Sequence, residues 1–522
     1  PLKLKMDKSN NAPLCSRIYP YYVLLILMLV YLTNQLDRYV LVPTNIAMSN
    51  DLKYGDRICE ATNGTSTKIW LANHAINSTA DNYCKNNEHL CDEQTKSNWN
   101  ETLCSWYYLG TGIEYQLLAG PLFIILFSLS GVPLGVIAEV SSANRKNLLT
   151  LIIFLWSCMT ILSGLAQTYW HVALTRLLIG VFQAGCTPFS ASIISDYFSS
   201  TQRGFALGFY NWGIYIGYSM SFLMNITTRL VGWRPVYIIA GAPGIVISIV
   251  VFFTVKEPER HGMTAASKLE DTAQDKSSAN VDQSVAMASN ASKFKEALRT
   301  FTNPVLLFLC LGGAIRNGGG YVWSYNINNF FTYYHPGTRV EMYMSWIPIV
   351  FGAIGAIGGG YISDKLLRQR GLSARLLVLI CSQILAAPFQ VGTLFLDPPW
   401  AFISQIPAYI FGEMWIGVCL AVVVDLVPYN LRASAVALYV FIISAIGGNM
   451  NIFVSPISEV LDLRIALLIT FPGLYVLGAA FFLLTLIIMK VCKKRLPNHD
   501  DLDEYTPLLQ EKKYRNGSVR RA

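Results

Sequence analysis

The sequence predicts an all-α membrane protein with twelve transmembrane helices in two pseudo-symmetric six-helix bundles. Three observations lead to this prediction. Apolar segments of about 20 residues, the length that crosses a hydrocarbon core of about 30 Å, recur along the chain. Charged residues make up only 14% of the 522 residues and gather in the two tails and one central stretch, whereas a soluble chain carries about 25%. A short motif of the first half also recurs in the second half.

Twelve apolar segments are long enough to span a bilayer. The first follows a polar, basic start and is long enough to cross, so we interpret it as a span and not as a cleavable signal peptide. The predicted spans are 20–47, 113–138, 147–166, 170–195, 205–228, 236–255, 305–326, 342–362, 374–394, 400–420, 433–453 and 465–489.

The repeated motif joins an acid, an arginine, an alanine and a tyrosine. Its two copies are separated by 229 residues at every position: Asp196, Arg203, Ala206 and Tyr210, then Asp425, Arg432, Ala435 and Tyr439. A two-fold repeat inside a membrane chain is typical of a transporter built from two related halves around a central site.

The spans and the repeat predict five regions. The central stretch is rich in Ala, Ser, Asp and Lys and indicates a flexible linker. The predicted regions are a cytoplasmic tail at 1–19, a first bundle at 20–255 with a lumenal loop at 48–110, a linker at 256–301, a second bundle at 302–490 and a cytoplasmic tail at 491–522.

Basic residues predict the orientation. They flank the same side of alternate spans, which places both termini in the cytoplasm, and the net charge of +8 reflects this excess instead of a nucleic-acid partner. The 48–110 loop then faces the lumen or the exterior, where disulfides and glycans form. It carries four cysteines, Cys59, Cys84, Cys91 and Cys104, for which three pairings into two disulfides are open, and glycosylation sequons at Asn63, Asn77 and Asn100.

Two loop motifs resemble the signature of the major facilitator superfamily. They are Gly135 to Glu139 before Arg145-Lys146, and Gly360 to Asp364 before Lys365. In that family the acid pairs with basic residues to hold one conformation, so the resemblance implies gating roles for Glu139 and Asp364, and we assign gating or structural roles to Arg203 and Arg432. The first copy departs from the family pattern, because Val140 stands where a basic residue is usual.

Further motifs resemble the Spinster branch of that superfamily and also its anion/cation symporter branch. They are Asp37-Arg38 in the first span, Arg176 to Pro188 in the fourth and Gly232-Trp233-Arg234 before the sixth. The resemblance implies alternating-access export of a lysophospholipid or sphingolipid-like amphiphile from a lysosome or late endosome, with proton coupling left open. The alternatives are a carrier of a small organic anion, sugar acid or sugar phosphate, a transport-dead receptor and a membrane enzyme.

Charges inside the spans are candidates for function, because each costs about 2.5–3.5 kcal/mol to insert. Asp37 and Glu413 are the candidate proton carriers, each with a purely structural pairing as the alternative. Glu413 lies close to the repeat equivalent of Gln183, which stands where Spinster proteins usually carry a glutamate and which cannot titrate.

Arginines and tyrosines are the candidate substrate contacts. Arg316 precedes Gly318-Gly319-Gly320, which predicts a helix that can unwind beside a phosphate- or carboxylate-binding guanidinium. Arg176 either binds an anionic head group or pairs with Asp37. The other predicted substrate residues are Arg38, Tyr215 and Tyr321.

No cofactor, metal site or catalytic nucleophile is predicted. The C-terminal tail carries Glu504, Leu508 and Leu509 in the spacing of an acidic dileucine signal, which adaptor proteins read. We therefore expect a lysosomal or late endosomal membrane protein, with the plasma membrane as the alternative; the oligomeric state stays open.

Overall fold

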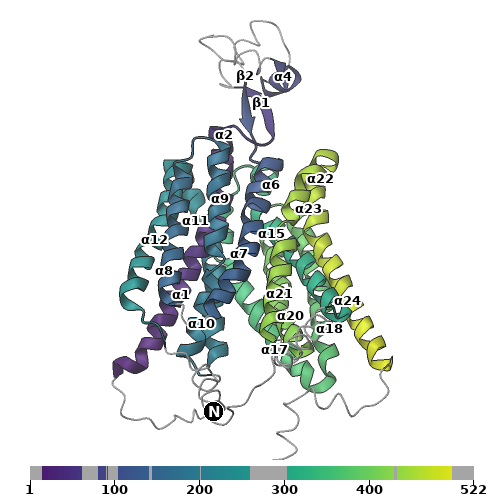
Figure 1. Ribbon diagram of the computed structural model, residues 1–522. Helices are drawn as coiled ribbons and strands as arrows, with labels where there is room; N and C mark the ends of the chain where they lie inside the picture. Colours follow the sequence, from purple (N-terminus) through teal and green to yellow (C-terminus); the bar gives the residue numbers. More distant parts are fainter. Residues whose placement is uncertain are drawn as a thin grey trace, which may run out of the picture.

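A computed structural model describes residues 14–61, 80–89, 91, 104–139, 144–199, 202–258, 302–427 and 432–495. Figure 1 shows the helices in two groups side by side, the N-terminal half in purple to teal and the C-terminal half in green to yellow. A small loop projects from one end, which we call the loop face. The opposite end, where α1 begins and α24 ends, is the termini face.

Each half is built of helices, several of them interrupted. The N-terminal half comprises α1 (Leu14–Tyr39), α2 (Leu41–Leu52), α6 (Ile113–Ala119), α7 (Pro121–Glu139), α8 (Arg145–Gly164), α9 (Tyr169–Gln183), α10 (Cys186–Tyr197), α11 (Arg203–Val231) and α12 (Trp233–Thr254). The C-terminal half comprises α15 (Pro304–Tyr334), α16 (Glu341–Met344), η1 (Pro348–Gly352), α17 (Ala353–Arg370), α18 (Leu372–Phe395), α19 (Trp400–Gly412), η2 (Glu413–Trp415), α20 (Ile416–Leu426), α21 (Arg432–Ile442), η4 (Ile443–Gly447), η5 (Met450–Phe453), α22 (Val454–Leu461), α23 (Leu463–Thr470) and α24 (Pro472–Arg495).

The twelve predicted spans all fall on these helices, which confirms the predicted fold class. Eleven helical segments in the described ranges are long and apolar enough to cross a membrane. The predicted fifth span corresponds to α11, which is 29 residues long but not among the eleven, because its glycines, tyrosines and asparagines lower its mean hydropathy. A helix suits the bilayer because it satisfies its own backbone hydrogen bonds where water is absent.

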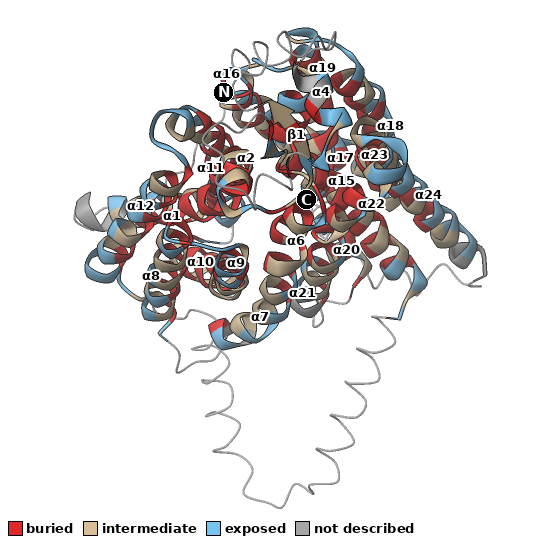
Figure 2. Cartoon of the chain, turned by 90° about the horizontal axis from the view of Figure 1, so that it is seen from above, coloured by how far each residue is buried: buried red, intermediate tan, exposed pale blue. Residues whose placement is uncertain are grey.

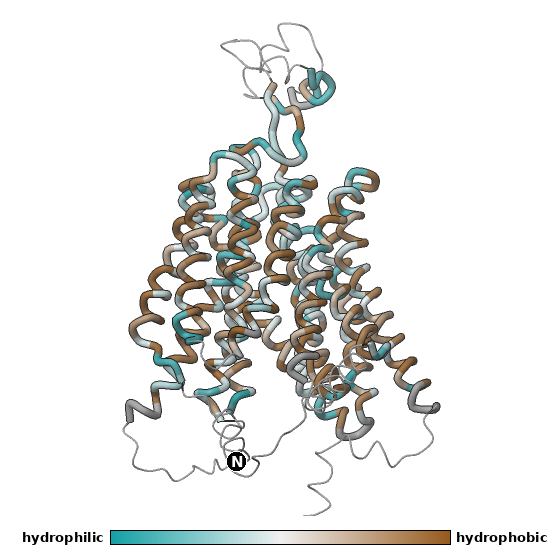
Figure 3. The backbone as a smooth tube through the Cα atoms, viewed as in Figure 1, coloured by the Kyte–Doolittle hydropathy of each residue, from teal (hydrophilic) through white to brown (hydrophobic). Residues whose placement is uncertain are grey.

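Apolar side chains cover the outside of the helices. Leu129, Leu230 and Phe253 are all more than half exposed. Figure 3 shows hydrophobic residues along the length of the helices and hydrophilic ones toward the loop and the termini face. In Figure 2 the exposed residues lie on the outer rim and the buried ones between the helices. This distribution is the one expected where lipid contacts the outer surface.

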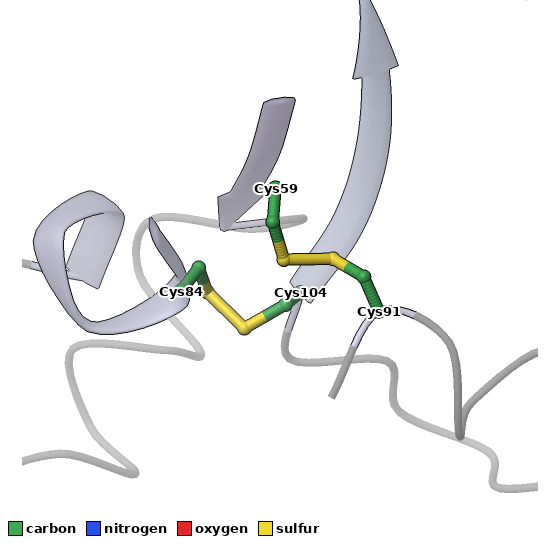
Figure 4. Close-up of a disulfide and its surroundings, with 4 residues drawn as sticks. All are labelled: Cys59, Cys84, Cys91 and Cys104. Carbon is green, nitrogen blue, oxygen red and sulfur yellow. A yellow bond between two sulfur atoms is a disulfide. The ribbon is translucent and has the colours of Figure 1, made fainter. Parts of the chain in front are cut away.

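The loop between the first two spans is tied together by two disulfides. They join Cys59 to Cys91 and Cys84 to Cys104, next to the antiparallel strands β1 (Arg57–Ala61) and β2 (Cys104–Tyr108) and the short helix α4 (Ala80–Asn86) (Figure 4). The loop spans 53–112, not 48–110 as predicted. The polar end of α2 stays helical because its side chains form hydrogen bonds with the loop. For example, Asn50 Nδ2 donates to the Tyr108 carbonyl of β2 at 2.7 Å.

Digestion of the non-reduced protein is expected to yield one peptide pair linked through Cys59 and Cys91, and another through Cys84 and Cys104. Mass spectrometry before and after reduction checks this pairing. Recovery of a Cys59–Cys84 or Cys59–Cys104 link would contradict it.

Close packing of α1 on α11 holds the N-terminal half together and depends on glycine. A Cβ on Gly217 would lie 2.3 Å from the Leu32 carbonyl oxygen of α1, so a larger residue forces the helices apart. Gly208, on the same helix, has no neighbouring atom within 4 Å of such a Cβ.

We therefore expect Gly217→Ala to destabilise the protein by about 1–3 kcal/mol, the usual cost of overpacking. Gly208→Ala, the matched control, should leave stability unchanged or slightly raised. Thermal unfolding of the purified variants in detergent measures both, and equal midpoints would contradict the packing described here.

Candidate functional site

The first span of each half carries one buried arginine. Arg38 lies near the end of α1 and Arg316 lies within α15. Arg38 is only 6% exposed and Arg316 only 2% exposed. A guanidinium keeps its charge in such a place, so its surroundings must supply acceptors, rings or a counter-ion.

Arg316 is fully engaged by its own half. Its Nη2 lies 3.1 Å from Glu413 Oε1 and also donates to the Gly412 carbonyl. Its Nε donates to Gln383 Oε1 at 3.1 Å. The guanidinium carbon also lies 4.5 Å from the ring centroids of both Trp415 and Tyr475. The predicted substrate residue Arg316 and the predicted proton carrier Glu413 therefore form one ion pair.

Arg38 also has an amide acceptor and two rings, but no acid and no backbone carbonyl, among its contacts in the part of the chain that the structure describes. Its guanidinium carbon lies 4.8 Å from the Phe123 ring centroid and 4.7 Å from that of Phe127. Its Nε donates to Gln183 Oε1 at 3.5 Å. No carboxylate forms an ion pair with Arg38 within the described ranges. The site around Arg38 thus keeps a net positive charge where the site around Arg316 is neutral.

The fourth span of each half is interrupted at the arginine's partner. The helix α9 ends at Gln183, and α19 ends at Gly412, directly before the 3₁₀ turn that begins at Glu413. These positions correspond in the sequence repeat to within one residue. Interrupted helices frequently form binding sites in transporters, because they free polar groups at mid-membrane.

The interruption predicted near Arg316 is wrong. The helix α15 runs without a break through Gly318, Gly319 and Gly320. The first two glycines instead allow close packing: a Cβ on Gly318 would lie 2.5 Å from Met450 Cγ, and one on Gly319 would lie 2.9 Å from the Phe471 carbonyl oxygen.

Asp37 faces away from Arg38, into the N-terminal half. Both of its carboxylate oxygens are buried without a hydrogen-bond partner in the described part of the chain. Arg176, Trp156 and Thr160 lie close enough to interact with this carboxylate. Arg176 Nη1 donates to the Arg38 carbonyl at 3.0 Å. Arg176 forms no ion pair with Asp37 within the described ranges, and its Nε and Nη2 are buried there without a hydrogen-bond partner, so both roles weighed for Arg176 stay open.

The two predicted tyrosines reach across the halves. Tyr215 on α11 donates to Glu413 Oε2 of the C-terminal half at 3.3 Å. Tyr321 on α15 packs against the cluster formed by Phe123, Ile124 and Ile179 of the N-terminal half. Arg38 of the N-terminal half therefore contacts the ring of Phe123, and Tyr321 of the C-terminal half packs against the cluster that contains Phe123.

At the termini face, one arginine in each half binds two carboxylates. Arg145 contacts Asp196 at 2.6 Å and Glu257 at 2.7 Å. Arg375 contacts Asp364 and Asp425, each at 2.9 Å. Sequence reasoning missed Arg375, although it lies in the first turn of α18 at nearly the repeat spacing from Arg145, which begins α8.

The remaining predicted site residues have few contacts or lie outside the described part of the chain. Arg203 Nη2 donates to the Ser195 carbonyl at 2.6 Å. No group of three His, Cys, Asp or Glu residues able to hold a metal occurs in the described ranges. Several predicted residues or their side chains lie outside the described part: Glu139, Arg432, Asn63, Asn77, Asn100, Glu504, Leu508 and Leu509. Residues 1–13 of the predicted N-terminal tail and 259–301 of the predicted linker also lie outside it.

Two repeated bundles with matched, interrupted spans define a membrane transport protein. The family model of the Major Facilitator Superfamily matches residues 27–450, and the chain belongs to that family. The "Probable galactarate/D-glucarate transporter GudP" of Bacillus subtilis is 26% identical over 307 residues, covering 55% of this chain and 65% of that protein. "Protein spinster homolog 1" of Xenopus tropicalis is 25% identical over 399 residues, covering 67% and 70%.

Among solved structures, the chain is similar to a bacterial homolog of the human lysosomal transporter Spinster in an inward-facing, unoccupied conformation. The TM-score is 0.64 at 22% identity, over 90% of this chain and 97% of that one. The sequence matches support the Spinster-like branch, and the structural likeness supports the fold.

Removing the Arg316 counter-ion is expected to destabilise the C-terminal half. Glu413→Gln leaves a buried guanidinium without its counter-ion, and loss of one partner of a buried ion pair costs about 3 kcal/mol. Because the Glu413 side chain is 21% exposed, we expect a smaller loss of stability than for a fully buried pair. The control is Asp51→Asn, since its pair with Arg234 is 39–47% exposed and should contribute less than about 1 kcal/mol. Denaturation in detergent measures both; equal effects would contradict the assignment of Arg316 as a compensated charge.

Proposed function

We propose that the protein is a secondary active transporter of an amphiphile or small molecule with an anionic group, and that it works by alternating access between its two halves. The observation that supports this most is Arg38, a buried guanidinium with no acid partner in the described ranges. Such a charge is costly in a membrane unless a ligand compensates it. A phosphate or carboxylate can do so in a bidentate manner.

The preferred substrate is a lysophospholipid or sphingolipid-like amphiphile. Its phosphate would bind Arg38, while Phe123, Phe127 and Tyr321 offer rings for its apolar part. The name of the Xenopus relative supports the Spinster-like reading. The second candidate is a sugar acid, because the Bacillus relative is named as a galactarate/D-glucarate transporter. Both candidates share the anionic group.

Several finer points belong to the same proposal. Asp37 and Glu413 remain the candidate proton carriers; of the two, Asp37 has no hydrogen-bond partner among the described residues and Glu413 already pairs with Arg316. Export from a lysosome or late endosome, glycans at the three sequons and adaptor binding at the C-terminal tail rest on the sequence motifs alone.

Uptake into proteoliposomes decides the substrate class. A labelled lysophospholipid and a labelled sugar acid are offered separately, each with protein-free vesicles as the control. Saturable uptake of the lipid supports the preferred substrate, and uptake of the sugar acid alone supports the second. Flux of neither would favour the transport-dead receptor and overturn the proposal.

Giving Arg38 an acid partner should weaken anion binding. We expect Gln183→Glu to reproduce the pair seen at Arg316 and Glu413, so that the transported anion binds on the order of tenfold more weakly or worse. Gln183→Leu removes the same amide without adding charge and should weaken binding much less. The half-saturating concentration for uptake measures both, and an equal loss in the two variants would contradict the role of Arg38.

A further inference from the structure

Side-chain amides form most of the hydrogen bonds between the two halves at the loop face. Gln116 Nε2 donates to Asn326 Oδ1 at 2.8 Å, and Asn225 Nδ2 donates to Asn328 Oδ1 at 3.2 Å. A third amide pair joins Asn45 to Asn329 at 3.4 Å. We call this set the amide seam: Asn45, Gln116, Asn225, Asn326, Asn328 and Asn329. Because all six side chains are buried, each bond lost on separating the halves must be replaced by water or a new partner.

The disulfide-bonded loop inserts one backbone carbonyl into this seam. The Gly110 oxygen accepts a hydrogen bond from Asn329 Nδ2 at 2.7 Å and another from Asn45 Nδ2. Asn45 belongs to α2 of the N-terminal half, and Asn329 belongs to α15 of the C-terminal half. The loop, which follows α2 in the chain, is therefore bound to the opposite half through Asn329.

The position of this carbonyl is fixed from several sides. Gly110 has a φ of +69°, and a Cβ there would lie 2.6 Å from Asn45 Nδ2, so that only glycine fits without displacement. Tyr54 OH, from the other arm of the loop, donates to Asn45 Oδ1 at 2.8 Å. Asn50 of α2 exchanges two hydrogen bonds with the backbone of Tyr108, at 2.7 and 2.9 Å.

The disulfides constrain the same strand that leads to Gly110. Cys104 is the first residue of β2, and its bond to Cys84 restrains the chain six residues before Gly110. On the paired strand, Cys59 is opposite Trp106 and bonds to Cys91. Reducing or removing a disulfide would therefore loosen the segment that presents the Gly110 carbonyl.

We propose that the disulfide-bonded loop is a working part of the gate at the loop face, and that Asn329 positions it by holding the Gly110 carbonyl against the C-terminal half. Opening of this face then requires release of the loop as well as separation of the helices. This inference rests on the alternating-access part of the proposed function.

The test measures the distance between two spin labels at the loop face, one on each half. Labels are attached through maleimide to Leu230→Cys on α11 and Met342→Cys on α16, since both native side chains are at least 60% exposed. The background lacks the free thiols. Double electron–electron resonance gives the share of molecules with a wide separation.

Three changes are compared in this background of the full-length protein. Asn329→Leu removes the link between the halves through the loop, together with the longer Asn45–Asn329 pair. Tyr115→Phe removes another bond between the halves, from the Tyr115 hydroxyl to the Tyr325 carbonyl, that does not involve the loop. Asn50→Leu removes loop bonds made within the N-terminal half alone. Each is measured with and without Cys84→Ser/Cys104→Ser.

Asn329→Leu and Tyr115→Phe should each raise the ratio of wide to narrow separations about two- to tenfold, as expected for loss of one or two hydrogen bonds, and Asn50→Leu should raise it less. Removing the disulfide should raise the ratio in the parent and in Tyr115→Phe but add nothing in Asn329→Leu. Circular dichroism and gel filtration confirm that each variant is folded.

Two results would overturn the inference. One is an additive effect of the disulfide in Asn329→Leu, which would show that loop and gate are independent. The other is no effect of the disulfide in any variant. A single narrow distance in every variant, even with transported substrate present, would instead overturn alternating access itself, so the two failures are distinguishable.

Discussion

The structure at the centre of this protein depends on how the buried guanidinium in the first span of each half is compensated. A charge in the hydrocarbon layer is tolerated only with acceptors, rings or a counter-ion around it. Arg316 has all three in Gln383, the rings of Trp415 and Tyr475, and Glu413. Arg38 has an amide and two rings, and no acid within the described ranges. The missing counter-ion is the physical reason to expect an anionic substrate on the N-terminal side.

The two halves are alike in construction and unlike in charge. In both, the fourth span is interrupted beside the arginine's partner, and in both an arginine at the termini face binds two carboxylates. The single exchange of an amide for a carboxylate, Gln183 against Glu413, makes one arginine site positive and the other neutral. Tyr215 of the N-terminal half also donates a hydrogen bond to Glu413 of the neutral pair. Movement of the Arg316–Glu413 pair would therefore alter a contact between the two halves.

Much of this arrangement could be predicted from sequence, because length and hydropathy fix the spans and the 229-residue repeat fixes the two halves. The repeat also indicated that Gln183 and Glu413 correspond. The unwinding predicted at Gly318 to Gly320 failed because glycine spacing alone does not distinguish a flexible helix from one packed closely against Met450 and Phe471. The link from Gly110 to Asn329 could not be predicted, since it joins residues 219 positions apart through a backbone carbonyl.

The central claim is that transport requires an anionic group that Arg38 can bind. It is tested most directly by uptake into proteoliposomes of paired compounds that differ in that group: a lysophospholipid against a monoacylglycerol, and a sugar acid against its neutral sugar. We predict saturable uptake of the charged member of one pair and none of its neutral partner. Equal uptake of both members of the transported pair would contradict the account.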